Sequence, residues 1–253
     1  QAIVEKIDSY NGPKDKVDAF SVSEVLNYSF EKFRSCENCC SFTFGVADTI
    51  VKQDIRGCMI KNGDKYFEES VSKSSMVSLA NRMFQTGKGN DVSMYSASKG
   101  SIEILENSAK GQYTSTNVKE FSNEEYKNTY GKTLDQMFIY LICDETINSS
   151  SIEKESEGYT ISVDLDKDLS TMDYKNQMKN ISNLDKLPSF SDVKLTFKLD
   201  SDLKLKKLSI DENYVATMMV DAKTNGLVDI YYYSDEYVKI PELSESVEYK
   251  KGE

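Results

Sequence analysis

The stretch from Asp192 to Pro241 constrains the fold more than any other part of the chain, because apolar and polar residues alternate along most of it. An alternation with a period of two is typical of a β-strand that has one buried face and one wet face. The break in this period between Leu205 and Leu208 predicts a β-bulge. The apolar positions are Val193, Leu195, Phe197, Leu199, Leu203, Leu205, Leu208, Ile210, Tyr214, Ala216, Met218, Val228, Ile230 and Tyr232.

Three segments rich in turn-forming residues divide this stretch, at 200–202, 211–213 and 223–226. The last of them contains Asn225-Gly226, a pair that favours a tight turn with positive φ. We therefore predict an antiparallel meander of about four strands. Such a sheet needs apolar residues from other elements to cover one of its faces.

The charge balance and the missing residue types exclude several classes of function. A formal net charge of -11 argues against nucleic-acid binding, because a phosphate backbone requires clustered Lys and Arg. The 253 residues include no His, which excludes Ser-His and Cys-His catalysis and histidine-based zinc sites. No apolar run approaches the roughly 20 residues of a transmembrane helix. We expect neither a metal nor another cofactor.

The N-terminal region is predicted to contain an arm followed by a helix. Residues 1–20 are polar and include a breaker at Asn11-Gly12-Pro13, so we expect a tether or a loosely docked arm. Ser21-Val22-Ser23-Glu24 is a capping box, and apolar residues then recur at three- and four-residue spacing as far as Phe33. This stripe predicts a helix that packs against a sheet. The start at Gln1 rather than Met predicts that a preceding segment was removed, through cleavage of a signal peptide or at an artificial boundary.

Two further helices are predicted later in the chain. Residues 122–125 form a second capping box, and Gly131 interrupts the helix that it opens. An amphipathic helix is expected from Leu169 to Ile181. Residues 72–92 fit either a helix or a strand, whereas 107–118 and 149–158 read as polar segments. Outside the meander, strands are expected at about 42–46, 53–60, from 65 onward after a turn at Asn62-Gly63, 91–98, 101–106 and 159–163.

This order of elements predicts an α+β fold, with a mostly antiparallel sheet and helices on one face. We expect one domain over residues 21–243, preceded by the arm of residues 1–20. Residues 244–253 are expected to form a polar C-terminal tail.

The five cysteines do not form a convincing redox or metal motif. Cys36-Glu37-Asn38-Cys39 has the spacing of a disulfide oxidoreductase, but it follows the C-terminal end of a predicted helix, where the dipole opposes a thiolate. A zinc site would need a second close pair, which is missing. If the first hairpin centres near Thr49, Cys40 and Cys58 face each other, and a disulfide between them is a candidate. Buried reduced thiols are the default expectation.

Several segments together resemble envelope lipoproteins of Gram-positive bacteria with the LolA/LppX-like fold. The resemblance covers roughly residues 20 to 243 and depends on the order of elements rather than on an invariant motif. The segments that carry it are Phe42-Thr43-Phe44-Gly45, Lys61 to Phe67, Tyr126 to Gly131, Tyr159 to Asp166, Pro188-Ser189-Phe190 and Val238 to Pro241.

The resemblance implies a strongly curved antiparallel half-barrel wrapped over a few helices, with an apolar cavity between them. Better-known relatives carry acylated molecules in this cavity, and a lipidated Cys near the mature N-terminus anchors them to the membrane. This chain has no Cys before Cys36, so such an anchor would lie in the preceding segment. An extracytoplasmic location at the cell membrane is expected on the same ground.

The function expected first is non-enzymatic binding of a lipid or another apolar small molecule between sheet and helices. The alternative is an interaction or sensor module for an envelope protein, in which the core is filled and the same residues are ordinary core. A hydrolase with an unrecognised pair of carboxylates is a third hypothesis. The candidates to line an apolar cavity are Phe44, Phe197, Leu199, Tyr214, Met218 and Tyr232.

Overall fold

The computed structural model describes residues 2–76, 78–89, 91–98, 101–136 and 138–252, without the side chains of 115–117. In these residues one open antiparallel sheet of 11 strands runs in the order β8-β5-β4-β3-β2-β1-β13-β12-β11-β10-β9. The strands are β1 (Asn38–Asp48), β2 (Lys52–Asn62), β3 (Lys65–Lys73), β4 (Ser78–Lys88), β5 (Asp91–Ser98), β8 (Thr114–Ser122), β9 (Ile147–Glu155), β10 (Gly158–Leu165), β11 (Ser189–Asp200), β12 (Leu205–Met218) and β13 (Val220–Ser234).

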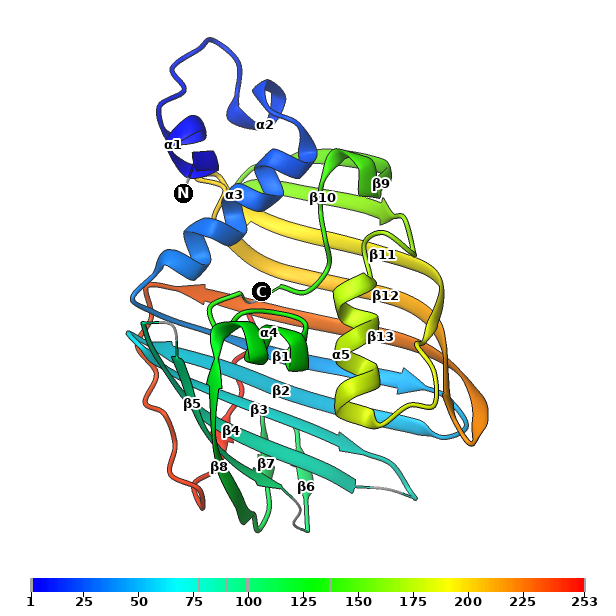
Figure 1. Cartoon of the computed structure of the whole chain (residues 1–253). Coiled ribbons are helices and arrows are strands. Elements are labelled where there is room, and N and C mark those ends of the chain that lie inside the picture. The colour runs from blue at the N-terminus through cyan, green and yellow to red at the C-terminus, as the bar shows by residue number, and fades with distance from the viewer. Residues whose placement is uncertain (1, 77, 90, 99–100, 137, 253) are drawn as a thin grey trace.

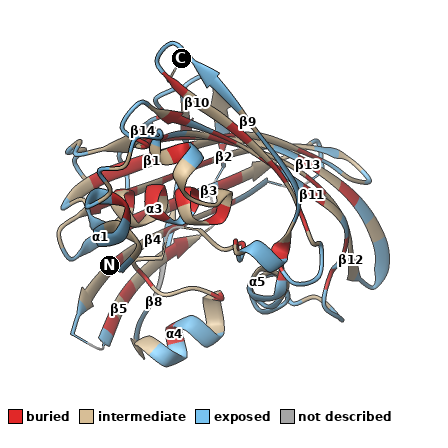
Figure 2. Cartoon of the chain, turned by 90° about the horizontal axis from the view of Figure 1, so that it is seen from above, coloured by how far each residue is buried: buried red, intermediate tan, exposed pale blue. Residues whose placement is uncertain are grey.

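The sheet is curved, and the longer helices lie on its concave side (Figures 1 and 2). The helices are α1 (Ala2–Asp8), α2 (Lys16–Ala19), α3 (Val22–Ser35), α4 (Asn123–Tyr130), α5 (Met172–Ser182) and the short 3-10 helix η1 (Asp144–Thr146). A second sheet of three short strands, β6 (Glu103–Leu105), β7 (Ser108–Lys110) and β14 (Val247–Glu248), packs against the convex face. The predicted mostly antiparallel sheet is confirmed, its combination with helices agrees with the predicted α+β class, and the sheet does not close into a barrel.

Both predicted capping boxes are confirmed. The Ser21 hydroxyl accepts a hydrogen bond from the Glu24 backbone N–H at the start of α3, and the Glu24 carboxylate accepts one from the Ser21 N–H in return. Ser122 and Glu125 form the same pair of bonds at α4. Helix α4 ends at Gly131, whose φ of 73° is left-handed. A Cβ there would lie 2.5 Å from a backbone oxygen of α5, so this glycine lets α4 and α5 approach each other.

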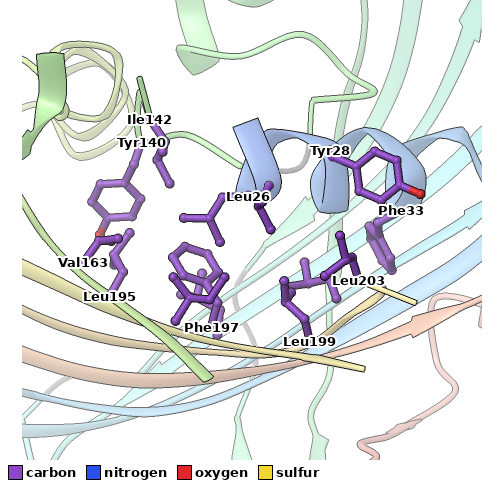
Figure 3. Packing of buried hydrophobic residues seen from close by; sticks show 14 of the residues in the cluster. Leu26, Tyr28, Phe33, Tyr140, Ile142, Val163, Leu195, Phe197, Leu199 and Leu203 are labelled. Atoms are coloured by element: carbon purple, nitrogen blue, oxygen red, sulfur yellow. The ribbon is translucent and has the colours of Figure 1, made fainter. Parts of the chain in front are cut away.

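Helix α3 fills one half of the concave face. Its apolar stripe, including Leu26 and Phe33, packs on Phe197 and Leu199 of β11, and all four side chains are almost fully buried (Figure 3). Burial of a side chain of this size contributes about 1.5–3 kcal/mol. This half of the molecule therefore has a conventional close-packed core.

The meander at the end of the chain has three strands rather than the predicted four. The bulge is confirmed, since the pairing of β11 with β12 shifts register between Lys198 and Leu199, opposite the break in the apolar period. The turns predicted at 211–213 and 223–226 are wrong, because both segments lie inside paired strands. The chain reverses instead at Met219, whose φ is 66°, between Met218 and Val220.

Several segments left as ambiguous or polar form strands. In 72–92 most of the described residues belong to β3, β4 and β5, and residues 74–76 and 89 lie in the connections between these strands. The strand alternative therefore holds there, and positions 77 and 90 lie outside the described residues. The strand expected at 101–106 is shorter, as β6. The polar segments 107–118 and 149–158 contribute β7, β8 and β9. Polar residues suit these strands because edge strands and small surface sheets leave much of their area in water.

Both terminal segments are docked on the rest of the protein. The expected arm of residues 1–20 contains α1 and α2, and Ile7 and Val17 are buried in the core beside α3. The expected polar tail at 244–253 contains β14, which pairs with β7, and Tyr249, which is buried against the convex face. A few apolar residues among many polar ones suffice for docking because they add to an existing core.

The first hairpin centres on Ile50 rather than Thr49, so the predicted register is wrong by two residues. Cys40 lies opposite Ile60, and Cys58 lies opposite Phe42. The two thiols therefore do not face each other, and all five cysteines of the chain are free. Burial raises the pKa of the Cys40 thiol to about 12, which keeps it protonated and unreactive at neutral pH.

Candidate functional site

The other half of the concave face is hollow. Two adjoining cavities of about 330 and 290 Å³ lie over strands β12, β13, β1, β2, β3 and β4. They share Thr43, Ile55, Lys132, Ile230 and Tyr232 as lining residues. The floor of the larger cavity is formed by every second residue of its strands, because strand side chains alternate between faces. These floor residues are Thr43, Ala47, Ile55, Leu208, Ile210, Glu212, Tyr214, Gly226, Val228, Ile230 and Tyr232.

The walls opposite the floor come from the segment after α4 and from α5. Phe138, Ile139 and Tyr140 face the larger cavity from the first segment, and Tyr174 and Gln177 face it from α5. Gln177 donates a hydrogen bond to the Tyr130 carbonyl at 2.7 Å, which ties α5 to the end of α4. The cavity is therefore bounded by elements that are held together independently of any ligand.

A single buried carboxyl group interrupts the apolar floor of the larger cavity. Glu212 of β12 is 5% exposed and accepts hydrogen bonds from two tyrosines. The Tyr140 hydroxyl donates to Oε2, and the Tyr174 hydroxyl donates to Oε1 at 2.9 Å. Among the residues that the structure describes, no Lys or Arg forms an ion pair with Glu212.

Burial shapes the proton affinities around this carboxyl group. It raises the pKa of Glu212 above the ordinary value, although the hydrogen bonds from Tyr140 and Tyr174 partly oppose the shift. Burial and the neighbouring Glu212 raise the pKa of both tyrosines well above 10, so they remain neutral donors. The same two causes raise the pKa of Tyr214 to about 12.

Gly226 gives Glu212 its space. The two residues are paired across β12 and β13, and a Cβ at Gly226 would lie 3.2 Å from Glu212 Cγ and 3.4 Å from Oε1. Any larger residue at this position would press on the carboxyl group. Gly226, which together with Asn225 predicted a turn, therefore belongs to the site.

The smaller cavity has a second charged group of a different kind. Lys132 Nζ lies 3.1 Å from Glu68 Oε1, and both side chains are mostly buried. This ammonium and carboxylate neutralise each other. Glu68 lines the smaller cavity but not the larger one, whereas Glu212 lines the larger cavity but not the smaller one.

The structure separates the six predicted cavity residues. Tyr214 and Tyr232 line the larger cavity. Phe197 and Leu199 lie in the packed core under α3, and Phe44 lies on the convex face, where it packs edge-on against Tyr231. Met218 is exposed at the tip of the β12–β13 hairpin.

Sequence reasoning missed Glu212, Tyr140 and Tyr174. A signal for the first was available, since Glu212 occupies an apolar phase of its strand, between Ile210 and Tyr214. A charged residue in a buried phase is uncommon unless it is paired or functional. The two tyrosines approach Glu212 only through the tertiary fold.

No family model matches the chain, and no curated protein matches it. Within the described ranges, three or more potential metal ligands do not come together. None of the helices in those ranges is long and apolar enough to cross a membrane. The cavity and its carboxyl group are therefore the candidate functional site.

Proposed function

We propose that this protein binds a lipid or another apolar small molecule, without catalysis, in the cavity between the sheet and the segments that follow α4. The observation that carries the proposal is the apolar lining of the larger cavity, with Ile210, Val228 and Ile230 on the floor and Phe138 and Ile139 opposite them. Pockets of a few hundred Å³ with apolar walls and a small number of polar groups are typical ligand sites.

A LolA/LppX-like fold and an envelope location belong to the same proposal. An open curved sheet with helices on its concave face agrees with the half-barrel that this resemblance implies. The location at the cell membrane is proposed on the resemblance alone. The ligand would then be a lipid of the cell envelope or a molecule that partitions into it.

Native mass spectrometry of protein purified without detergent, followed by solvent extraction, tests the proposal. We expect an adduct of a few hundred daltons that is released as a lipid, or one that forms on adding acyl lipids. Val228→Phe should reduce the affinity for added lipid by about tenfold or more, equivalent to about 1.4 kcal/mol, because the larger ring occupies the cavity.

Leu227→Phe is the matched control, because Leu227 is the neighbouring residue and points to the exposed convex side. It should bind lipid like the unchanged protein. A 28.7 kDa species without an adduct, which also fails to bind added acyl lipids, would contradict the proposal. Equal binding by both variants would place the ligand outside this cavity.

The second candidate is a module that binds an envelope protein. The tip of the β12–β13 hairpin favours it, since Met218, Met219 and Val220 are consecutive and strongly exposed. Exposed apolar patches often mark interaction sites. Lipid binding that Val228→Phe blocks would favour the first candidate. A protein that binds no lipid would favour the second candidate, with this hairpin as the interaction site.

A further inference from the structure

We propose that the larger cavity selects amphiphilic ligands with a protonated amine, which forms an ion pair with the Glu212 carboxylate at the cavity floor. This inference rests on the proposed lipid-binding function and names the chemical class of the ligand.

The carboxylate has acceptor capacity that the protein does not use. An ionised carboxylate offers about four lone-pair positions. The hydroxyl groups of Tyr140 and Tyr174 take one position on each oxygen. The remaining positions are next to the cavity, since Glu212 is among its lining residues and Gly226 leaves the neighbouring space free of a side chain. An ammonium group of a ligand has the three N–H donors to use them.

The charge of Glu212 also has no ion-pair partner among the residues that the structure describes. A buried carboxylate with neutral partners pays a large desolvation cost that a nearby cation would offset. Within the part of the chain that the structure describes, the basic side chain facing this cavity is Lys132, which pairs with Glu68. A ligand amine would supply the missing positive charge through charge-assisted hydrogen bonds, which are about twice as strong as neutral ones.

The surroundings of Glu212 fit the rest of such a molecule. Ile210 precedes Glu212 on the same face of β12, and Val228 and Ile230 follow Gly226 on the same face of β13. An alkyl or acyl chain would lie along these residues while its amine contacts the carboxylate. A carboxylic acid of equal length would place two negative groups together and should be rejected.

Three probes of the same chain length test the inference: dodecylamine and dodecanoate below their micelle concentrations, and dodecanol below its solubility limit. Binding is measured by isothermal titration calorimetry at pH 7 and about 0.15 M salt, where the Debye length is about 8 Å and the general attraction of an acidic protein for cations is screened. We expect dodecylamine to bind at least about tenfold more tightly than dodecanol, and dodecanoate to bind most weakly.

Glu212→Gln should abolish the preference for the amine, so that dodecylamine and dodecanol bind the variant with similar affinity. Asp211→Asn is the matched control, because Asp211 is the adjacent residue, points to the convex face and changes the net charge by the same amount. It should retain the preference. The comparison of the three probes on the unchanged protein needs no variant, so it decides the matter even if Glu212→Gln does not fold.

The possible outcomes distinguish a failure of the amine preference from a failure of the proposed lipid binding. Equal binding of amine and alcohol, both blocked by Val228→Phe, would overturn the amine preference and leave lipid binding intact. An amine preference that survives Glu212→Gln would also overturn it. Failure of all three probes to bind would overturn the inference together with the proposed function.

Discussion

Two buried glutamates lie on opposite faces of the same sheet and differ in one respect. Glu69 on the convex face accepts hydrogen bonds from Tyr113 and Tyr249, and Arg82 Nε donates to it at 2.6 Å. Glu212 on the concave face also accepts hydrogen bonds from two tyrosines but, among the described residues, forms no ion pair with a cation. The first carboxylate is thus completed by the protein, and the second is left incomplete at the floor of a cavity.

The difference teaches how a structural charge and a candidate binding charge can be told apart. Arg82 also donates to the carbonyl oxygens of Glu242 and Leu243, so the pair with Glu69 fastens the C-terminal segment to the sheet. The donors of the Glu69 cluster, Arg82, Tyr113 and Tyr249, therefore all bond to acceptors within the protein. Stability requires nothing of this kind from Glu212, whose burial without a cation costs free energy. Groups that cost stability in this way are common at functional sites.

The largest expected effect comes from breaking the convex pair. Arg82→Met leaves Glu69 buried without a cation and should lower the free energy of unfolding by about 3–5 kcal/mol, measured by urea denaturation at pH 7. The double variant Glu69→Gln/Arg82→Met removes both charges and should recover part of that loss. A loss below about 1 kcal/mol in the single variant would show that the pair is not needed for stability.

An intermediate effect is expected when a donor of the concave site is removed. Tyr174→Phe deletes the hydrogen bond to Glu212 Oε1, and bonds to charged groups contribute about 1.5–3 kcal/mol. We expect the loss in urea denaturation to be largest at pH 7 and smaller at pH 4, where the carboxyl group is neutral and the bond weaker. An equal loss at both values would mean that Glu212 keeps its proton throughout this range.

The smallest expected effect is the change in the free energy of unfolding when each glutamate is replaced by glutamine. It separates the two sites best, because its sign should differ between Glu212 and Glu69. The raised pKa of Glu212 means that the folded protein holds this proton more tightly than the unfolded chain does. The resulting stability is present below the unfolded pKa and is lost as the pH rises through the folded pKa. Glu212→Gln escapes that loss, so the ligand-free variant should be more stable at pH 7, by on the order of 1 kcal/mol.

The advantage of Glu212→Gln should disappear at acidic pH, which urea denaturation at pH 4 and pH 7 will reveal. Glu69→Gln should be destabilising at pH 7, because it leaves Arg82 buried without its partner. If Glu212→Gln destabilises the ligand-free protein at pH 7 as Glu69→Gln does, the two carboxylates serve the same structural purpose and the contrast between them fails.

Much of the local structure could be predicted from the sequence, because it depends on neighbours in the chain. The capping boxes at Ser21 and Ser122 and the bulge after Leu205 follow from local hydrogen bonding and alternation. The turn expected at Asn225-Gly226 failed for a tertiary reason. Asn225 bonds to Asp211 and Asn213 across the strands, and Gly226 makes room for Glu212.

The candidate site was less predictable than the fold. An apolar alternation assigns Tyr214 and Phe197 to the same face of the sheet, but it does not reveal where α3 ends and the cavity begins. That boundary depends on which helix covers which strands. Tyr214 therefore lines the cavity while Phe197 is packed in the core.

The tyrosines around Glu212 have an optical consequence. The chain contains no Trp, so its intrinsic ultraviolet emission comes from tyrosine. Tyr140 and Tyr174 donate hydrogen bonds to a carboxyl group, and an excited phenol in such a bond passes its proton to the carboxylate and loses emission. A ligand cation that pairs with the carboxylate would weaken these hydrogen bonds and restore part of the tyrosine emission. The protein would then report the occupancy of its own cavity without an attached dye.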